Sequence, residues 1–161
     1  GSLTGRAFSP GLFFDIFNNN LKVLIFSFVF SLILGGGSIF IVIWNASLWG
    51  TIFGTLAKLA ATTTGRNPWI LFGLIFLIVF PHMILEAISY FLAAISGSVI
   101  SKDVLLEKFV SERFLGVFSF NMYLLVMAIL FLVLGALVET FVLDNVGVYQ
   151  EIIRMSFLAG S

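Results

Sequence analysis

The chain has 161 residues, of which 60% are hydrophobic and 10% are charged, and its formal net charge is zero. Soluble domains carry about 25% charged residues, so this composition indicates an integral membrane protein and leaves no room for a sizeable soluble domain. No basic block marks a nucleic-acid-binding surface, and the absence of cysteine excludes disulfides and thiolate metal sites. We expect one transmembrane helical domain over residues 3–159, with the Gly-Ser pairs at 1–2 and 160–161 left over from cloning.

The chain begins with a short amphipathic segment and a glycine-rich crossing. Residues 9–19 place apolar side chains on one helical face but are too few to span a bilayer, which predicts an interfacial helix. Residues 21–43 reach the ~20 residues that a crossing needs. Gly35, Gly36 and Gly37 lie in its second half, where small residues predict close packing against another helix, although three glycines also favour a local kink.

The next segment is short and rich in small residues. We expect a loop at residues 44–49, whose two tryptophans would lie at the membrane interface. Residues 50–61 follow, and Gly50 and Gly54 in this segment predict a thin helix packed inside the bundle. A polar turn at residues 62–67 then leads back into the membrane.

The longest apolar run extends from Pro68 to Ile100 and contains Pro81. A continuous helix over this run would be about 50 Å long, which is too much for one crossing. Because proline breaks or kinks a helix, we predict that the chain turns at Pro81 and divides the run into a broken or re-entrant pair. Gly97, near the end of the run, is a candidate helix-packing position.

The remaining chain contains one charged stretch and one clear crossing. The charged residues at 101–113 predict a short amphipathic helix on the membrane, and residues 118–142 predict the last crossing. Residues 144–158 are mildly amphipathic, so we expect them at the surface. The predicted fold is an all-α, polytopic transmembrane helix bundle with four to five membrane segments and additional interfacial helices.

The distribution of basic residues favours the turn at Pro81. If the chain turns back there, seven of the eight Lys and Arg residues share one side of the membrane and only Arg154 lies opposite. One straight crossing would divide them more evenly. Because cytoplasmic loops are rich in Lys and Arg, the turn predicts a cell-membrane protein with a cytoplasmic N-terminus and an external C-terminus.

Four polar side chains within apolar segments form the candidate site: Asn45, His82, Glu86 and Glu139. His82 and Glu86 are one helical turn apart, and ionisable residues inside a membrane are costly enough to mark functional positions. With a turn at Pro81 all four lie in the outer half of the membrane, whereas a straight helix would separate Glu139 from the others. A lone histidine without an HExxH spacing favours a structural hydrogen-bond network over a proton path or a metal site. We therefore expect no metal, cofactor or catalytic residue.

Several features of the chain occur together in one known family. They are the aromatic and asparagine-rich stretch 13–20, the glycine-rich crossing that ends before Asn45, the Pro81-His82-x-x-x-Glu86 element, and Glu139 followed by Thr140 and Phe141. The pattern resembles the stage II sporulation protein M family, although Met83 stands where that family usually has glycine. The resemblance implies a multi-pass membrane protein. In spore-forming bacteria the namesake acts in engulfment, as a membrane partner of cell-wall-degrading enzymes.

The sequence favours a non-enzymatic membrane scaffold that binds a partner membrane protein or a second copy of itself. The first alternative is a small transporter or channel, with His82, Glu86 and Glu139 lining an outward-facing polar cavity. An intramembrane metal hydrolase is the third hypothesis. A scaffold should have these side chains hydrogen-bonded to one another and closed to water, whereas a transporter should have a polar cavity that reaches them.

Overall fold

The computed structural model describes residues 8–35, 38–106 and 111–159, and every regular element within these ranges is an α-helix. Four of the five helices are long and apolar enough to cross a membrane. The predicted all-α transmembrane bundle is therefore confirmed. The helices are α1 (Pro10–Leu34), α2 (Ser38–Thr64), α3 (Pro68–Leu106), α4 (Glu112–Asn145) and α5 (Gly147–Ala159).

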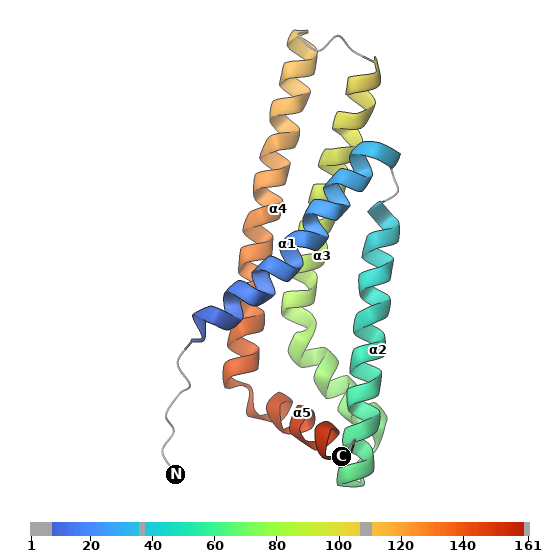
Figure 1. Ribbon diagram of the computed structural model, residues 1–161, viewed down its shortest axis with the longest axis vertical. Helices are drawn as coiled ribbons and strands as arrows, with labels where there is room; N and C mark the ends of the chain where they lie inside the picture. The colour runs from blue at the N-terminus through green and yellow to red at the C-terminus, as the bar shows by residue number, and fades with distance from the viewer. Residues whose placement is uncertain (1–7, 36–37, 107–110, 160–161) are drawn as a thin grey trace.

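The helices α2, α3 and α4 run along the length of the molecule, and α1 crosses in front of α3 and α4 at an angle (Figure 1). The short α5 lies across one end of the molecule, near the junction of α2 and α3. Because α1 is oblique, it approaches α2 near the segment that joins them and diverges from it towards its own N-terminus. This divergence shapes the site described below.

The helix α1 is longer than the sequence indicated. It starts at Pro10, where the fixed φ of proline suits the first helical position, and continues without a break through residues 18–20. The predicted interfacial helix and the first crossing are thus one element. The three asparagines do not end the helix, because Asn20 turns inward and finds a partner there.

The glycine run ends α1 instead of lying within a crossing. Gly35 has a φ of 62°, and its amide donates to the carbonyl of Ser31 at 2.9 Å. Glycine adopts this left-handed conformation without the cost that a Cβ would impose. Gly35 thus ends α1, and its carbonyl oxygen accepts a hydrogen bond from Ser98 of α3 at 2.8 Å, while Gly36 and Gly37 lie outside the described residues.

The helix α2 includes the segment predicted as a loop. Residues 44–49 contain neither glycine nor proline and continue the helix, so the prediction of a loop was wrong. A Cβ added at Gly50 or Gly54 would meet no other atom within 4 Å. The expected packing role of these two glycines is also wrong, because they face away from the neighbouring helices.

The helix α3 passes through Pro81 without a break, which corrects the predicted turn. Proline removes one backbone hydrogen bond, but a membrane helix tolerates this where neighbouring helices surround it. Contacts with all four other helices provide that support for α3. Figure 1 shows the first half of α3 slanting towards the end of α2, while the second half stands upright. An apolar helix that is longer than the bilayer is thick can fit within it by tilting or bending.

A single crossing by α3 changes the topology of the chain. The chain crosses four times, so the start of α1 and the whole of α5 lie at the same end of the molecule (Figure 1). Ser9 joins this end to α4, since its amide and hydroxyl groups donate to the Asp144 carboxylate at 2.9 and 3.0 Å. The expectation that the two termini lie on opposite sides of the membrane was wrong.

In the C-terminal half, the predicted crossing and the predicted amphipathic segment both form helices. The predicted last crossing lies within α4, which begins after the capping residue Ser111, whose hydroxyl accepts from the Phe114 amide at 3.1 Å. The predicted surface segment forms α5, with Tyr149 and Ile152 buried on one face. The charged stretch is divided between the end of α3 and the start of α4, and its central residues, 107–110, lie outside the described residues.

Two apolar cores occupy the two ends of the bundle. One core joins α2, α3, α5 and the end of α4 around Ile75 and Val79, and the other joins α1, α3 and α4 around Leu24 and Leu132. At the second core α1 and α3 approach each other at Gly97. A Cβ added there would lie 2.4 Å from the carbonyl oxygen of Phe28. The polar side chains described next lie between these two cores.

Candidate functional site

Glu86 lies where α1, α3 and α4 meet. Its side chain is 2% exposed, and its Oε1 accepts a hydrogen bond from Nδ2 of Asn20 at 2.6 Å. A second hydrogen bond joins its carboxyl group to that of Glu139 on α4. Side chains from three helices thus form one buried polar connection.

The fold brings α4 close enough for this contact because α4 has a glycine at the crossing point. A Cβ added at Gly135 would lie 3.2 Å from Cγ of Glu86 and 3.6 Å from the carbonyl oxygen of His82. Small residues at such positions let membrane helices approach closely. Gly135 was not singled out from the sequence, where it is one of several glycines in apolar segments.

The depth of Glu86 follows from its position in α3. It lies about 27 Å along the helix axis from Pro68 and about 21 Å from Ile100, at 1.5 Å per residue. Because the hydrocarbon core of a bilayer is about 30 Å thick, Glu86 lies far from both surfaces. A charged side chain at the centre of a membrane helix costs about 3 kcal/mol, and the bonds to Asn20 and Glu139 offset part of that cost.

The His82 side chain contacts α2 and not Glu86. It is 1% exposed, and its ring contacts Trp49 of α2 with the ring centroids 5.4 Å apart. The hydrogen-bond partners of Glu86 among the described residues are Asn20 and Glu139, not His82. The Nδ1 atom of His82 is buried and has no hydrogen-bond partner within the described part of the chain. The expected pairing of His82 with Glu86 is therefore not formed.

A cavity of about 170 Å³ lies beside His82. Glu139 of α4 and Tyr149 of α5 line it together with His82. Burial raises the pKa of Tyr149, and the nearby Glu139 carboxylate raises it further. Within the described ranges no group of three His, Cys, Asp or Glu residues is arranged to hold a metal ion. The arrangement therefore gives no support to the metal hydrolase hypothesis.

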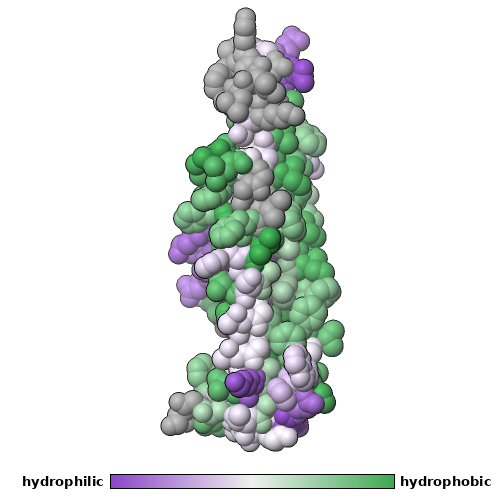
Figure 2. All heavy atoms as spheres, turned by 90° about the vertical axis from the view of Figure 1, so that its right-hand side faces the viewer, coloured by the Kyte–Doolittle hydropathy of each residue, from purple (hydrophilic) through white to green (hydrophobic). Residues whose placement is uncertain are grey.

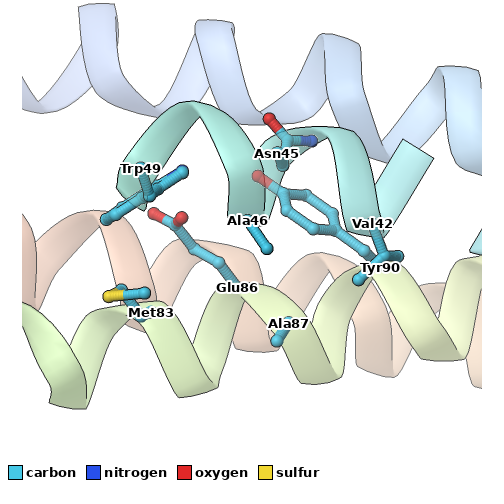
Figure 3. Close-up of a pocket in the computed structure, with 8 residues that line it drawn as sticks. All are labelled: Val42, Asn45, Ala46, Trp49, Met83, Glu86, Ala87 and Tyr90. Atoms are coloured by element: carbon cyan, nitrogen blue, oxygen red, sulfur yellow. The ribbon is translucent and has the colours of Figure 1, made fainter. Parts of the chain in front are cut away.

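Asn45 approaches the same centre from α2. It lines a small cavity of about 80 Å³ together with Glu86 and Tyr90. Figure 3 shows the Glu86 and Tyr90 side chains extending from α3 towards α2, with the Tyr90 hydroxyl group beside Asn45. The four predicted site residues thus line two small cavities at the meeting point of the helices.

The sequence reasoning held that an unbroken α3 would separate Glu139 from the other three residues, and this was wrong. The slanted first half of α3 extends beyond the end of α4 (Figure 1). The C-terminal part of α4 is therefore level with the middle of α3, where His82 and Glu86 lie. Glu139 meets Glu86 for this reason and not because the chain turns at Pro81.

A larger cavity of about 390 Å³ opens between α1 and α2 at this level. Its polar lining comes from Asp15, Asn19 and Asn20 of α1, Asn45 of α2 and Glu139 of α4. We call these five residues the polar foot. The sequence reasoning missed the three from α1, because it assigned asparagines between apolar segments to a loop.

An apolar cavity of about 510 Å³ continues from the polar foot along α1 and α2. It shares Asn19, Asn45 and Leu48 with the polar cavity, so the two form one trough. We call this trough the α1–α2 groove. The apolar wall of the groove consists of Val23, Phe26, Phe30, Phe40, Ile41 and Trp44.

Comparison with known proteins gives one match. A family model described as Stage II sporulation protein M matches residues 4–142 of the chain. No curated protein and no solved structure matches the chain. The matched stretch contains the polar foot and the whole of the α1–α2 groove, and it ends before α5.

Proposed function

Because the chain belongs to the stage II sporulation protein M family of integral membrane proteins, we propose that it is a non-enzymatic component of a membrane complex. In this proposal a partner membrane protein occupies the α1–α2 groove. The observation that carries it is the groove itself, which combines an apolar wall with a polar foot inside the membrane. Its wall is open, since Phe26, Phe40 and Trp44 are 62%, 65% and 57% exposed.

The outer face of α1 supports the same assignment. Asp15, Asn18, Asn19 and Lys22 are all exposed on this membrane-crossing helix. Figure 2 shows a hydrophilic patch at mid-height, with hydrophobic atoms above and below it. Polar and charged side chains that face lipid are costly, and such side chains instead hold membrane helices together. A partner that covers α1 beside the groove would remove them from lipid.

Photo-crosslinking in cells that naturally contain the protein tests this proposal. Benzoylphenylalanine is placed at Phe30 or Trp44 in the groove, and at Val126 or Phe141 on the exposed face of α4 as matched controls. We expect the groove positions to give a discrete adduct with another membrane protein and the α4 positions to give none. Adducts that form equally from both faces would contradict the proposal, and an adduct of twice the chain mass would identify a second copy as the partner.

We also infer that the end with the start of α1 and with α5 faces the cytoplasm of a cell-membrane protein. Lys58 near the end of α2, Arg66 after it and Arg154 on α5 belong to this end, against Lys102 and Arg113 among the described residues of the other end. Cytoplasmic segments are rich in Lys and Arg. The chain has no cysteine, so single introduced cysteines can be labelled cleanly. In intact cells a membrane-impermeant maleimide should label Glu112→Cys and not Thr62→Cys. The reverse pattern would invert the orientation.

A transporter remains the second candidate because the polar cavity reaches Glu139. In this case Glu139 would exchange a proton or cation with the cavity. Proteoliposomes that contain a pH-sensitive dye would then show a proton flux that Glu139→Gln abolishes. A flux no greater than that of empty liposomes would remove this candidate.

A further inference from the structure

The chemistry of the polar foot points to one feature of the partner. Building on the function proposed above, we propose that the groove holds a partner transmembrane helix with one lysine or arginine. The basic side chain of that helix would lie against the carboxyl groups of Asp15 and Glu139.

The charge of the groove is the first reason. Its polar foot contains two carboxyl groups and three carboxamides, and none of the described residues that line the groove is basic. Lys22 lies on α1 two turns beyond Asp15 but does not line the groove. Carboxylate and amide oxygens accept hydrogen bonds from ammonium and guanidinium groups, and bonds to a charged donor are the stronger kind. The groove thus offers acceptors to a cation that the described part of the chain does not supply there.

The depth of the polar foot is the second reason, and it favours a helix over a lipid amine. Within the polar foot Glu139 and Asn45 lie deeper than Asp15, which is about 8 Å along α1 from Pro10. Glu139 is beside Glu86, which lies more than 20 Å along α3 from either end of its apolar run. Asn45 similarly lies about 20 Å along α2 from Lys58. The amine of a phospholipid headgroup lies at the bilayer surface, whereas a helix can place a basic residue at any depth.

The shape of the groove is the third reason. Its polar and apolar parts lie between the diverging helices α1 and α2, with lining residues from Asp15 to Phe30 on one helix and from Phe40 to Ile52 on the other. An elongated trough with an apolar wall is the form in which proteins bind a single helix. A basic residue within a membrane helix is unfavourable unless it is paired, so burial against the polar foot would satisfy both partners.

A designed peptide tests the inference directly. The probe is a Leu-Ala transmembrane peptide of about 23 residues with one lysine at its centre, and the matched probe has glutamine there. Binding to the full-length protein is measured by fluorescence energy transfer in phosphatidylcholine nanodiscs. We expect the lysine peptide to bind about tenfold more tightly than the glutamine peptide, a difference of about 1.4 kcal/mol. Equal affinities would overturn the inference.

Variants of the polar foot connect this preference to the groove. Asp15→Asn combined with Glu139→Gln should abolish the preference for lysine. Asp15→Asn alone changes only an exposed side chain, so it should fold normally and reduce the preference several-fold even if the double variant does not fold. A preference that survives Asp15→Asn unchanged would place the basic residue elsewhere and overturn the assignment.

Two further results separate this inference from the proposed function. If nanodiscs enriched in phosphatidylethanolamine displace the lysine peptide while the glutamine peptide stays bound, a lipid amine occupies the polar foot and the helix assignment fails. If Phe30 and Trp44 crosslink to a partner protein whose membrane helix has no basic residue, the proposed function stands and this inference alone fails.

Discussion

Replacing Gly97 by alanine is expected to lower the free energy of unfolding by about 3 kcal/mol, a large effect for one added methyl group. The new Cβ would lie 2.4 Å from the carbonyl oxygen of Phe28 and 2.8 Å from Cβ of Ser31. Because the obstructing oxygen belongs to the backbone of α1, no side-chain rotation relieves the clash. The helices α1 and α3 would have to move apart, which would weaken the hydrogen bond from Ser98 to the Gly35 carbonyl.

Gly54→Ala provides the matched control for this variant. A Cβ at Gly54 meets no atom within 4 Å, and alanine is a better helix former than glycine by about 1 kcal/mol. We therefore expect Gly54→Ala to leave the stability unchanged or to raise it slightly. Denaturant titration in mixed micelles, followed by circular dichroism, measures both variants. Equal loss of stability in the two would contradict the close approach of α1 and α3.

Removing the Glu86 carboxyl group should have the second large effect. Glu86→Ala leaves Nδ2 of Asn20 and the carboxyl group of Glu139 buried without their partner, and it creates a cavity. Together these changes should cost about 3 kcal/mol. Glu86→Gln keeps an oxygen that can accept from Asn20, so it should cost less. Phe141→Leu on the lipid-facing side of α4 should cost less still.

A double-mutant cycle separates the hydrogen bond from the cavity. The cycle combines Asn20→Ala with Glu86→Ala, and the same titration gives the free energy of unfolding of each variant. Hydrogen bonds between membrane helices show coupling energies of about 0.6 kcal/mol on average and up to about 1.7 kcal/mol. Because this bond is short and buried, we expect about 1 kcal/mol or more. Strictly additive losses would mean that Asn20 and Glu86 do not interact.

The sequence predicted the class of the fold and the lone polar residues, because both depend on composition. Sixty per cent hydrophobic residues in long runs can fold only as membrane helices, and any carboxylate in such a run stands out. The positions of the helix ends were less predictable. Pro81 and the asparagines at 18–20 are weak helix formers on their own, but neighbouring helices surround Pro81 and provide a hydrogen-bond partner for Asn20.

The groove could not be predicted, because it depends on the angle at which α1 diverges from α2. No residue in the sequence fixes that angle alone. It results from Gly35 ending α1, from the close contact at Gly97, and from the bond between Asn20 and Glu86. The turn at Pro81 was wrongly predicted for a similar reason. The length limit set by bilayer thickness applies to a straight, upright helix, whereas α3 is slanted over part of its length.

The central claim is that a partner membrane protein occupies the α1–α2 groove. Electron cryomicroscopy of the crosslinked complex in nanodiscs measures this most directly. The account predicts density for a partner helix between α1 and α2, with one side chain reaching the polar foot at Asp15 and Glu139. A groove filled only by lipid, with the partner seated on the outer face of α4 instead, would contradict it.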